Sequence, residues 1–221
     1  MEKDIQKAVA LFTLAATKEN SFAAFALGKL YLAGDAALPR DPAAALKWLT
    51  YAAELGNQFA QYRLGKLLLK GDDGIPKDVI TAIRWLTAAA KQENGYAEYA
   101  LALVYLTGED APKDSVKALS LLKRSAGRGN QFAQYRLGKL LLQGEDAPKD
   151  VKAAIRWLTA AAEQGNQYAQ YALGKLYLLG KEVPKDRSSA IKWFQLAADQ
   201  GNEYAQYFLK HMDDRLGQPP V

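Results

Sequence analysis

The stretch GNQFAQYRLGKLLLKG at residues 56–71 returns at residues 129–144 as GNQFAQYRLGKLLLQG, with fifteen of its sixteen letters unchanged. Near-identity over this length within one chain of 221 residues indicates an internal repeat. Looser copies occur as well, and each carries an asparagine at its start. Aligned on that residue, successive copies lie 37, 37, 36, 36 and 36 residues apart, at Asn20, Asn57, Asn94, Asn130, Asn166 and Asn202. This period is typical of stacked helical repeats.

Each repeat contains two segments whose ends carry the residues that helix termini favour. The first segment opens on the asparagine, a preferred N-cap, and closes on a glycine such as Gly34, which adopts a left-handed conformation without steric cost. A proline follows, and two residues after it stands an aspartate such as Asp41, which can cap the next helix. The second segment ends near Gly56, where the next repeat begins at once. Turns this short predict antiparallel neighbouring helices.

Apolar residues follow a helical period in both segments. In the second segments they stand four, five, eight, eleven and twelve residues after the aspartate, which makes one stripe on an α-helix. The seventh residue is tryptophan in four copies. In the first segments a glycine recurs in the middle, at Gly28, Gly65, Gly138 and Gly174. Because a mid-helix glycine costs about 1 kcal/mol relative to alanine, its recurrence predicts close contact with a neighbouring helix.

The pattern predicts an all-α solenoid of about 12 antiparallel helices, built from repeats of 36–37 residues. The two ends differ from the interior, because the chain starts with a lone second segment and finishes with a lone first segment. In that last segment Lys210 replaces the mid-helix glycine and Asp213 replaces an apolar residue, so it is expected to cap the array. We expect a single array at 1–216, divided into a half-repeat at 1–19, repeats at 20–56, 57–93, 94–129, 130–165 and 166–201, and a capping helix at 202–216, followed by a disordered tail at 217–221.

Composition narrows the class of protein. The chain is 49% hydrophobic and 24% charged, as soluble globular proteins are, and its apolar runs are shorter than the roughly 18 residues of a membrane span. Its first residues lack the pattern of a signal peptide, so we expect a cytoplasmic protein. There is no cysteine and a single histidine, His211, which excludes thiolate metal sites and cysteine nucleophiles. We expect no enzyme activity, no metal and no cofactor.

The unit GNQYAQYALGKLYLLGKEVPKDRSSAIKWFQLAAD at residues 165–199 resembles the Sel1-like repeat, a relative of the tetratricopeptide repeat. It shares the A-x-x-x-L-G-x-x-Y core, the acidic linker and the closing A-A-x-x-G-N, and the resemblance extends over nearly the whole chain. It implies a right-handed α–α superhelix that binds other proteins and has no catalysis of its own. The array is also similar in style to the repeats that follow the nicking domain of some mobilisation relaxases of Gram-positive bacteria.

In tetratricopeptide-like solenoids the first helix of each repeat lines the concave face, so its recurring residues are candidates for binding. Counted from the asparagine, the sixth residue is aromatic in every copy and the tenth is lysine in four copies. Four residues apart on a helix, they share a face. The fifth residue adds Gln61, Glu98, Gln134, Gln170 and Gln206 to these ladders. The candidate partner-binding residues are Tyr62, Lys66, Tyr99, Tyr135, Lys139, Tyr171 and Lys175.

The hypothesis is a monomeric scaffold whose tyrosines and lysines bind a protein or peptide that carries carboxylates. Two structural interpretations stay open, in which the tyrosines pack between repeats and the lysines form a solvated face. An alternative function is an accessory module of a relaxase that associates with nucleic acid. The net charge of +5 favours that alternative, whereas the interspersed charges disfavour it. An engineered or consensus-like array without a native ligand is a further alternative.

Overall fold

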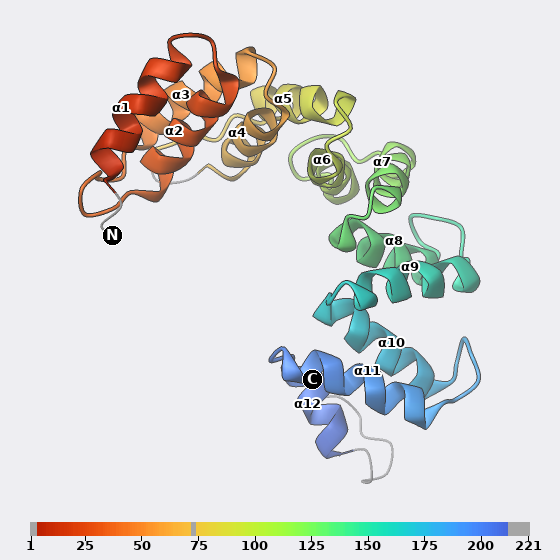
Figure 1. Ribbon diagram of the computed structural model, residues 1–221. Coiled ribbons are helices and arrows are strands. Elements are labelled where there is room, and N and C mark those ends of the chain that lie inside the picture. The colour runs from red at the N-terminus through yellow and green to blue at the C-terminus, as the bar shows by residue number, and fades with distance from the viewer. Residues whose placement is uncertain (1–3, 72–73, 212–221) are drawn as a thin grey trace. The chain divides into compact units, whose positions relative to one another are not determined.

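The computed structural model describes residues 4–71 and 74–211, and within these ranges the regular structure is helical, without a β-strand. The prediction of an all-α repeat protein with 12 helices is confirmed (Figure 1). The helices are α1 (Ile5–Ala16), α2 (Ser21–Ala33), α3 (Pro42–Glu54), α4 (Gln58–Lys70), α5 (Val79–Lys91), α6 (Gly95–Thr107), α7 (Ser115–Gly127), α8 (Gln131–Gln143), α9 (Val151–Glu163), α10 (Gln167–Leu179), α11 (Arg187–Asp199) and α12 (Glu203–Lys210).

The helices group into two compact units, Met1–Asp114 with α1 to α6 and Ser115–Val221 with α7 to α12. Even-numbered helices are the first helices of the repeats, and odd-numbered helices are the second helices. Within a repeat, α2 packs on α3, α4 on α5, α8 on α9 and α10 on α11. The expected capping helix is described as α12 up to its C-cap His211, while residues 212–216 and the expected tail at 217–221 lie outside the described residues.

The predicted caps are present. The Asn57 side chain accepts hydrogen bonds from the backbone N–H groups of Phe59 and Ala60, both at 3.0 Å. Asp41 does the same for the second helix of its repeat, accepting from Ala44 at 2.9 Å, and Pro42 stands at the first helical position. Each cap satisfies a backbone donor that has no partner inside its helix. The caps therefore fix where each helix begins.

The glycines that end the first helices differ between long and short linkers. Gly108, Gly144 and Gly180 are left-handed, as predicted. Gly34 and Gly71 also have positive φ, but their ψ angles of 164° and 111° are extended, so for them the predicted left-handed conformation is wrong. Their linkers contain one residue more before the capping aspartate, which gives the chain a longer path to the same capping position.

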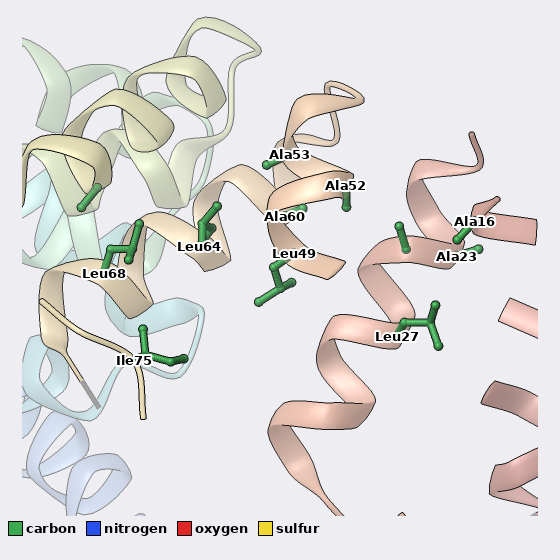
Figure 2. Close-up of a cluster of buried hydrophobic side chains, with 12 residues drawn as sticks. Ala16, Ala23, Leu27, Leu49, Ala52, Ala53, Ala60, Leu64, Leu68 and Ile75 are labelled. Atoms are coloured by element: carbon green, nitrogen blue, oxygen red, sulfur yellow. The ribbon is translucent and has the colours of Figure 1, made fainter. Parts of the chain in front are cut away.

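The core of each unit lies between first and second helices. In the first unit, Leu27 of α2, Leu49 of α3 and Leu64 of α4 are each at most 1% exposed, and Figure 2 shows these side chains with the small residues around them. Ile75, in the linker after α4, closes the same cluster at 3% exposure. Alanines such as Ala52 and Ala60 complete it and let the helices approach one another.

The mid-helix glycines make the predicted close contacts. A β-carbon added to Gly65 of α4 would stand 2.6 Å from Cγ of Leu86 in α5, and one added to Gly28 of α2 would stand 2.6 Å from Cγ of Leu49 in α3. These distances are far below a van der Waals contact. Glycine is therefore required at these positions by the packing of the two helices of one repeat.

Candidate functional site

The seven candidate residues lie on the first helices, in two groups. Tyr62 and Lys66 of α4 and Tyr99 of α6 belong to the first unit. The other four belong to the second unit, where they line one cavity of about 320 Å³ between α8 and α10. These four are Tyr135, Lys139, Tyr171 and Lys175.

The cavity has an apolar floor. Leu142 of α8 contributes to it, together with Ala172, Leu176 and Leu179 of α10. Leu176 is 9% exposed and Leu179 is 36% exposed, so the floor continues from the core toward solvent. A hollow of this size, with mostly apolar walls and a few polar groups at its rim, is suited to an apolar side chain of a partner.

The rim of the cavity carries an excess of positive charge. Lys139, Lys175 and Lys181 line it, and the single carboxylate among the lining residues is Glu182. The Glu182 carboxylate already accepts a hydrogen bond from the Lys149 ammonium at 2.8 Å. The rim therefore presents an electrostatic potential that favours an anionic group next to the apolar floor.

Two lysine ammonium groups lie over the tyrosine rings one turn earlier. The Nζ atom of Lys139 is 5.9 Å from the ring centroid of Tyr135, and that of Lys66 is 6.0 Å from the ring centroid of Tyr62. A cation over an aromatic face is attracted by about 0.5–1 kcal/mol at an exposed site. The interaction is weak enough to leave the ammonium available to a carboxylate.

The tyrosines also pack between repeats. The Tyr135 ring lies 6.0 Å from the ring of Tyr168 in the next first helix, and the Tyr171 ring lies 5.9 Å from that of Tyr204. Tyr171 additionally contacts Phe194, at 5.8 Å between centroids. Burial raises the pKa of Tyr171, so its phenol stays protonated at neutral pH. The rings of Tyr135 and Tyr171 therefore both pack against the next repeat and line the cavity.

The first helices carry a third recurring residue that is not among the candidates predicted from the sequence. When the asparagine is counted as the first residue, the third residue is aromatic in every copy. Its exposed fraction ranges from 45% to 66%. Four of these rings pack on the sixth-position ring of the preceding repeat in the same unit: Phe59 stacks on Phe25 at 6.4 Å, and Tyr96, Tyr168 and Tyr204 lie tilted against Tyr62, Tyr135 and Tyr171 at 5.9–6.0 Å. The same count that singled out the sixth and tenth residues would have found it. These residues are Phe22, Phe59, Tyr96, Phe132, Tyr168 and Tyr204.

The expectation for the fifth-position residues is wrong. Gln134 is only 5% exposed, and its Nε2 donates to the carbonyl oxygen of Ala126 at 3.1 Å. Its Oε1 accepts from Nε2 of Gln164 at 2.7 Å. Because the fifth residue follows a core alanine, Ala133, the helical period turns it toward the preceding helix. Gln61 and Gln170 make the same contacts, Glu98 is fully buried, and only Gln206 is exposed.

His211 packs at the end of the chain's last described helix. Its ring lies 4.3 Å from that of Tyr207, and its Nδ1 is 2.9 Å from the Tyr207 carbonyl oxygen. Among residues 4–71 and 74–211 no three histidine, aspartate or glutamate side chains are grouped so as to hold a metal ion. Within the same ranges no helix has the length and apolar character needed to cross a membrane.

Comparison with known proteins decides the family. The Sel1 repeat model matches the chain six times, at residues 1–20, 21–57, 58–94, 95–130, 131–166 and 167–202. The chain belongs to the Sel1 repeat family. Sel1 repeat proteins commonly mediate protein–protein interactions and are generally scaffolds without catalysis. No curated protein matches the chain.

Solved structures of Sel1 repeat proteins resemble this chain closely. One is a Sel1 repeat protein from Oxalobacter formigenes, with 34% identity and a TM-score of 0.85 over 96% of this chain. Another is a protective antigen of uropathogenic Escherichia coli, with 34% identity and a TM-score of 0.83 over 95% of this chain. The present chain spans 61% and 45% of these two proteins, respectively. An immunity protein from Pseudomonas aeruginosa shares the fold at 19% identity and a TM-score of 0.56, with 96% of this chain and 81% of that one covered.

Proposed function

We propose that this Sel1 repeat protein is a monomeric, non-enzymatic scaffold of the cytoplasm that binds a partner protein through an acidic segment containing large apolar residues. The binding site is the cavity between α8 and α10, and the observation that carries the proposal is its combination of an apolar floor with three lysines at the rim. An apolar side chain fills the hollow, while neighbouring carboxylates meet Lys139 and Lys175.

The physical argument rests on two contributions. Burial of an apolar side chain on Leu142 and Leu176 contributes about 25 cal/mol for each Å² removed from water. The lysine ammonium groups contribute less at an exposed site, up to about 1 kcal/mol each, but they select an anionic partner and speed its association. The tyrosine rings are held by the neighbouring repeat, so little conformational entropy is lost when a ligand packs on them.

Fluorescence anisotropy with two labelled peptides tests the proposal. One peptide alternates leucine with aspartate and glutamate, and the other has asparagine and glutamine in place of the acids. The acidic peptide is expected to bind at least tenfold more tightly, with an affinity that falls as salt is added. Equal affinity for the two peptides would remove the electrostatic part of the proposal.

Matched lysine variants locate the site. The double substitution Lys139→Glu with Lys175→Glu is expected to weaken binding of the acidic peptide by tenfold or more. Lys152→Glu, on an exposed part of α9 outside the cavity, changes the net charge without touching the rim and is expected to leave binding within about twofold. Joint substitution of Tyr135 and Lys139 by alanine, with helicity checked by circular dichroism, should also abolish binding. If that variant folds and binds normally, the cavity is not the site.

Duplex DNA is the competing ligand in the same assay, because the net charge of +5 is compatible with phosphate binding. A binding constant for arbitrary duplex that falls steeply with salt, together with no binding of the acidic peptide, would replace the scaffold proposal with a nucleic-acid-associated function.

A further inference from the structure

The exposed side chains of α2 and α4 are almost all aromatic or cationic. Neither helix contains an aspartate or a glutamate, and none of their leucines is exposed. Charges that are interspersed along the whole sequence are thus separated in this part of the fold. Apart from Ala33 at the end of α2, the exposed residues of the two helices are Phe22, Lys29, Phe59, Arg63, Lys66 and Lys70.

The aromatic and cationic residues lie on the same side of each helix. In α4, Arg63 and Lys66 follow Phe59 by four and seven residues, which are spacings that bring side chains onto one stripe of an α-helix. In α2, Lys29 follows Phe22 by seven residues and occupies the place that Lys66 has in α4. We call these five residues the α2–α4 face.

Ring contacts join the exposed sides of neighbouring first helices within the first unit. The Phe25 ring of α2 stacks on the Phe59 ring of α4 at 6.4 Å between centroids, and the Nζ atom of Lys29 lies 5.7 Å from the Phe25 centroid. The Tyr62 ring of α4 packs in turn on that of Tyr96 in α6, at 5.9 Å. Phe22, Phe59 and Tyr96 remain 66%, 47% and 56% exposed. Rings and cations therefore form one continuous surface.

The first helices of the second unit expose a different set of residues. For α8 and α10 these are Phe132, Gln143, Tyr168, Lys175 and Leu179. Arg136 and Lys139 of α8, the counterparts of Arg63 and Lys66, are only partly exposed. The exposed apolar surface of the α2–α4 face is aromatic, whereas the floor of the cavity between α8 and α10 is aliphatic. The two surfaces are thus suited to different ligands.

Single-stranded nucleic acid has the chemistry that this face complements. Its phosphates are attracted to lysine and arginine side chains, and its unpaired bases stack on aromatic rings whatever their sequence. A protein segment rich in carboxylates and leucines would find the cations but no aliphatic surface beside them. In a duplex the bases stack on one another and their faces are not accessible to the phenyl rings.

We propose that the α2–α4 face binds single-stranded nucleic acid. Bases stack on Phe22 and Phe59, while phosphates meet Lys29, Arg63 and Lys66. This activity goes beyond the scaffold function and uses the first unit, whereas the acidic peptide binds in the second.

Fluorescence anisotropy with a labelled oligothymidylate of about twelve nucleotides tests the proposal on the full chain. The expected Kd is about 1–100 µM in 50 mM salt, and three phosphate contacts should make the affinity fall about 20-fold between 50 and 200 mM salt. An abasic strand of the same length keeps the phosphates and lacks the bases. It should bind at least tenfold more weakly, as should a duplex of that length.

Ring variants test the stacking. Phe22→Ala combined with Phe59→Ala should weaken oligothymidylate binding by about tenfold or more and leave its salt dependence unchanged, because the cations remain. Phe132→Ala is the matched control, at the same position of the near-identical helix α8 and 45% exposed. It should change the affinity by less than about twofold. Circular dichroism checks that each variant retains its helices.

Charge variants test the phosphate contacts. Arg63→Gln combined with Lys66→Gln should weaken binding and reduce the salt effect over the same range to about threefold, as one remaining contact predicts. Lys47→Gln combined with Arg84→Gln makes the same change in net charge at exposed residues of α3 and α5 in the same unit. This control should leave the affinity within about twofold of wild type.

Three results would overturn the proposal. The first is no saturable binding of the oligothymidylate in 50 mM salt, and the second is equal binding of the abasic strand, which would leave only an attraction between charges. The third is an equal loss of affinity in the two charge variants. If the oligothymidylate does not bind while Arg63→Gln with Lys66→Gln weakens the acidic peptide, the face binds a protein segment instead. The cavity between α8 and α10 is tested with other substitutions, so the two proposals fail separately.

Discussion

Leu158 lies so close to Gly138 that a β-carbon on the glycine would stand 2.7 Å from its Cγ. The same β-carbon would stand 3.1 Å from the carbonyl oxygen of Ala154. Gly138 of α8 thus lies against two groups of α9, the backbone carbonyl of Ala154 and the fully buried side chain of Leu158. The absence of one side chain sets the separation of the two helices of the repeat.

Replacing this glycine should therefore destabilise the protein despite the higher helix propensity of alanine. Gly138→Ala is expected to lower the free energy of unfolding by about 1–3 kcal/mol, because the leucine and the Ala154 carbonyl have to move. Gly127→Ala is the matched control in α7, where a β-carbon meets nothing within 4 Å, and it should be neutral or stabilise by up to about 1 kcal/mol. Urea denaturation followed by circular dichroism measures both. Equal effects of the two substitutions would contradict the contact.

The buried glutamines should contribute through their hydrogen bonds. Gln134→Met keeps the side-chain volume but leaves the Ala126 carbonyl without the Nε2 donor at 3.1 Å, so the free energy of unfolding should fall by about 1–3 kcal/mol. Gln206→Met removes a longer bond of 3.3 Å at an exposed position and should cost less than about 1 kcal/mol. Thermal unfolding of the two variants in the same buffer provides the comparison. A larger loss for Gln206→Met would be inconsistent with this role.

The helices and their caps were predictable because their signals are local. Asn57 and Asp41 bind backbone groups two or three residues away, so the sequence alone specifies those contacts. The mid-helix glycines were predictable for a different reason: a residue that costs helix stability recurs only where packing requires it. The prediction of close contact at Gly65 needed no knowledge of which residue it meets.

The site was predictable only in part. Counting residues from the asparagine brought out Tyr135 and Lys139, yet it could not show that the fifth residue, Gln134, turns into the protein, because that depends on where the preceding helix ends. The cavity depends likewise on the separation of α8 and α10, which no local pattern encodes. The exposed aromatic residues at the third position, such as Tyr168, could have been predicted from the sequence, because they recur with the same period.

The cap of α11 predicts a dependence of stability on pH. Hydrogen bonds from the Ser189 hydroxyl, at 2.6 Å, and from its backbone N–H, at 3.0 Å, hold the pKa of Asp186 below its ordinary value of 3.8. A carboxyl whose pKa is lower in the folded state contributes stability above its unfolded pKa, and this contribution is lost as the pH falls through the folded value. Asp186→Asn keeps an acceptor without a titrating group.

The difference in melting temperature between wild type and Asp186→Asn should consequently be constant from pH 7 to about 5 and shift in favour of the variant as the pH falls below 3.8. Melting curves recorded over this pH series measure it. A difference that does not change with pH would mean that the Asp186 carboxyl titrates alike in the folded and unfolded chains.

The backbone of Glu19, in the turn after α1, is strained, and a substitution by glycine should remove the strain. Glu19 has a φ of 61°, in the left-handed region, where a side chain costs about 1–2 kcal/mol, whereas Gly56 and Gly165 occupy the matching turns of other repeats with φ of 84° and 88°. Glycine removes that strain but adds about 0.5–1 kcal/mol of unfolded-state entropy. Glu19→Gly should thus raise the free energy of unfolding by about 0.5–1 kcal/mol, and Gly165→Ala should lower it by about 1 kcal/mol. Chemical denaturation tests both, and a loss of stability in Glu19→Gly would show that the glutamate side chain, and not the backbone angle, determines the stability of this turn.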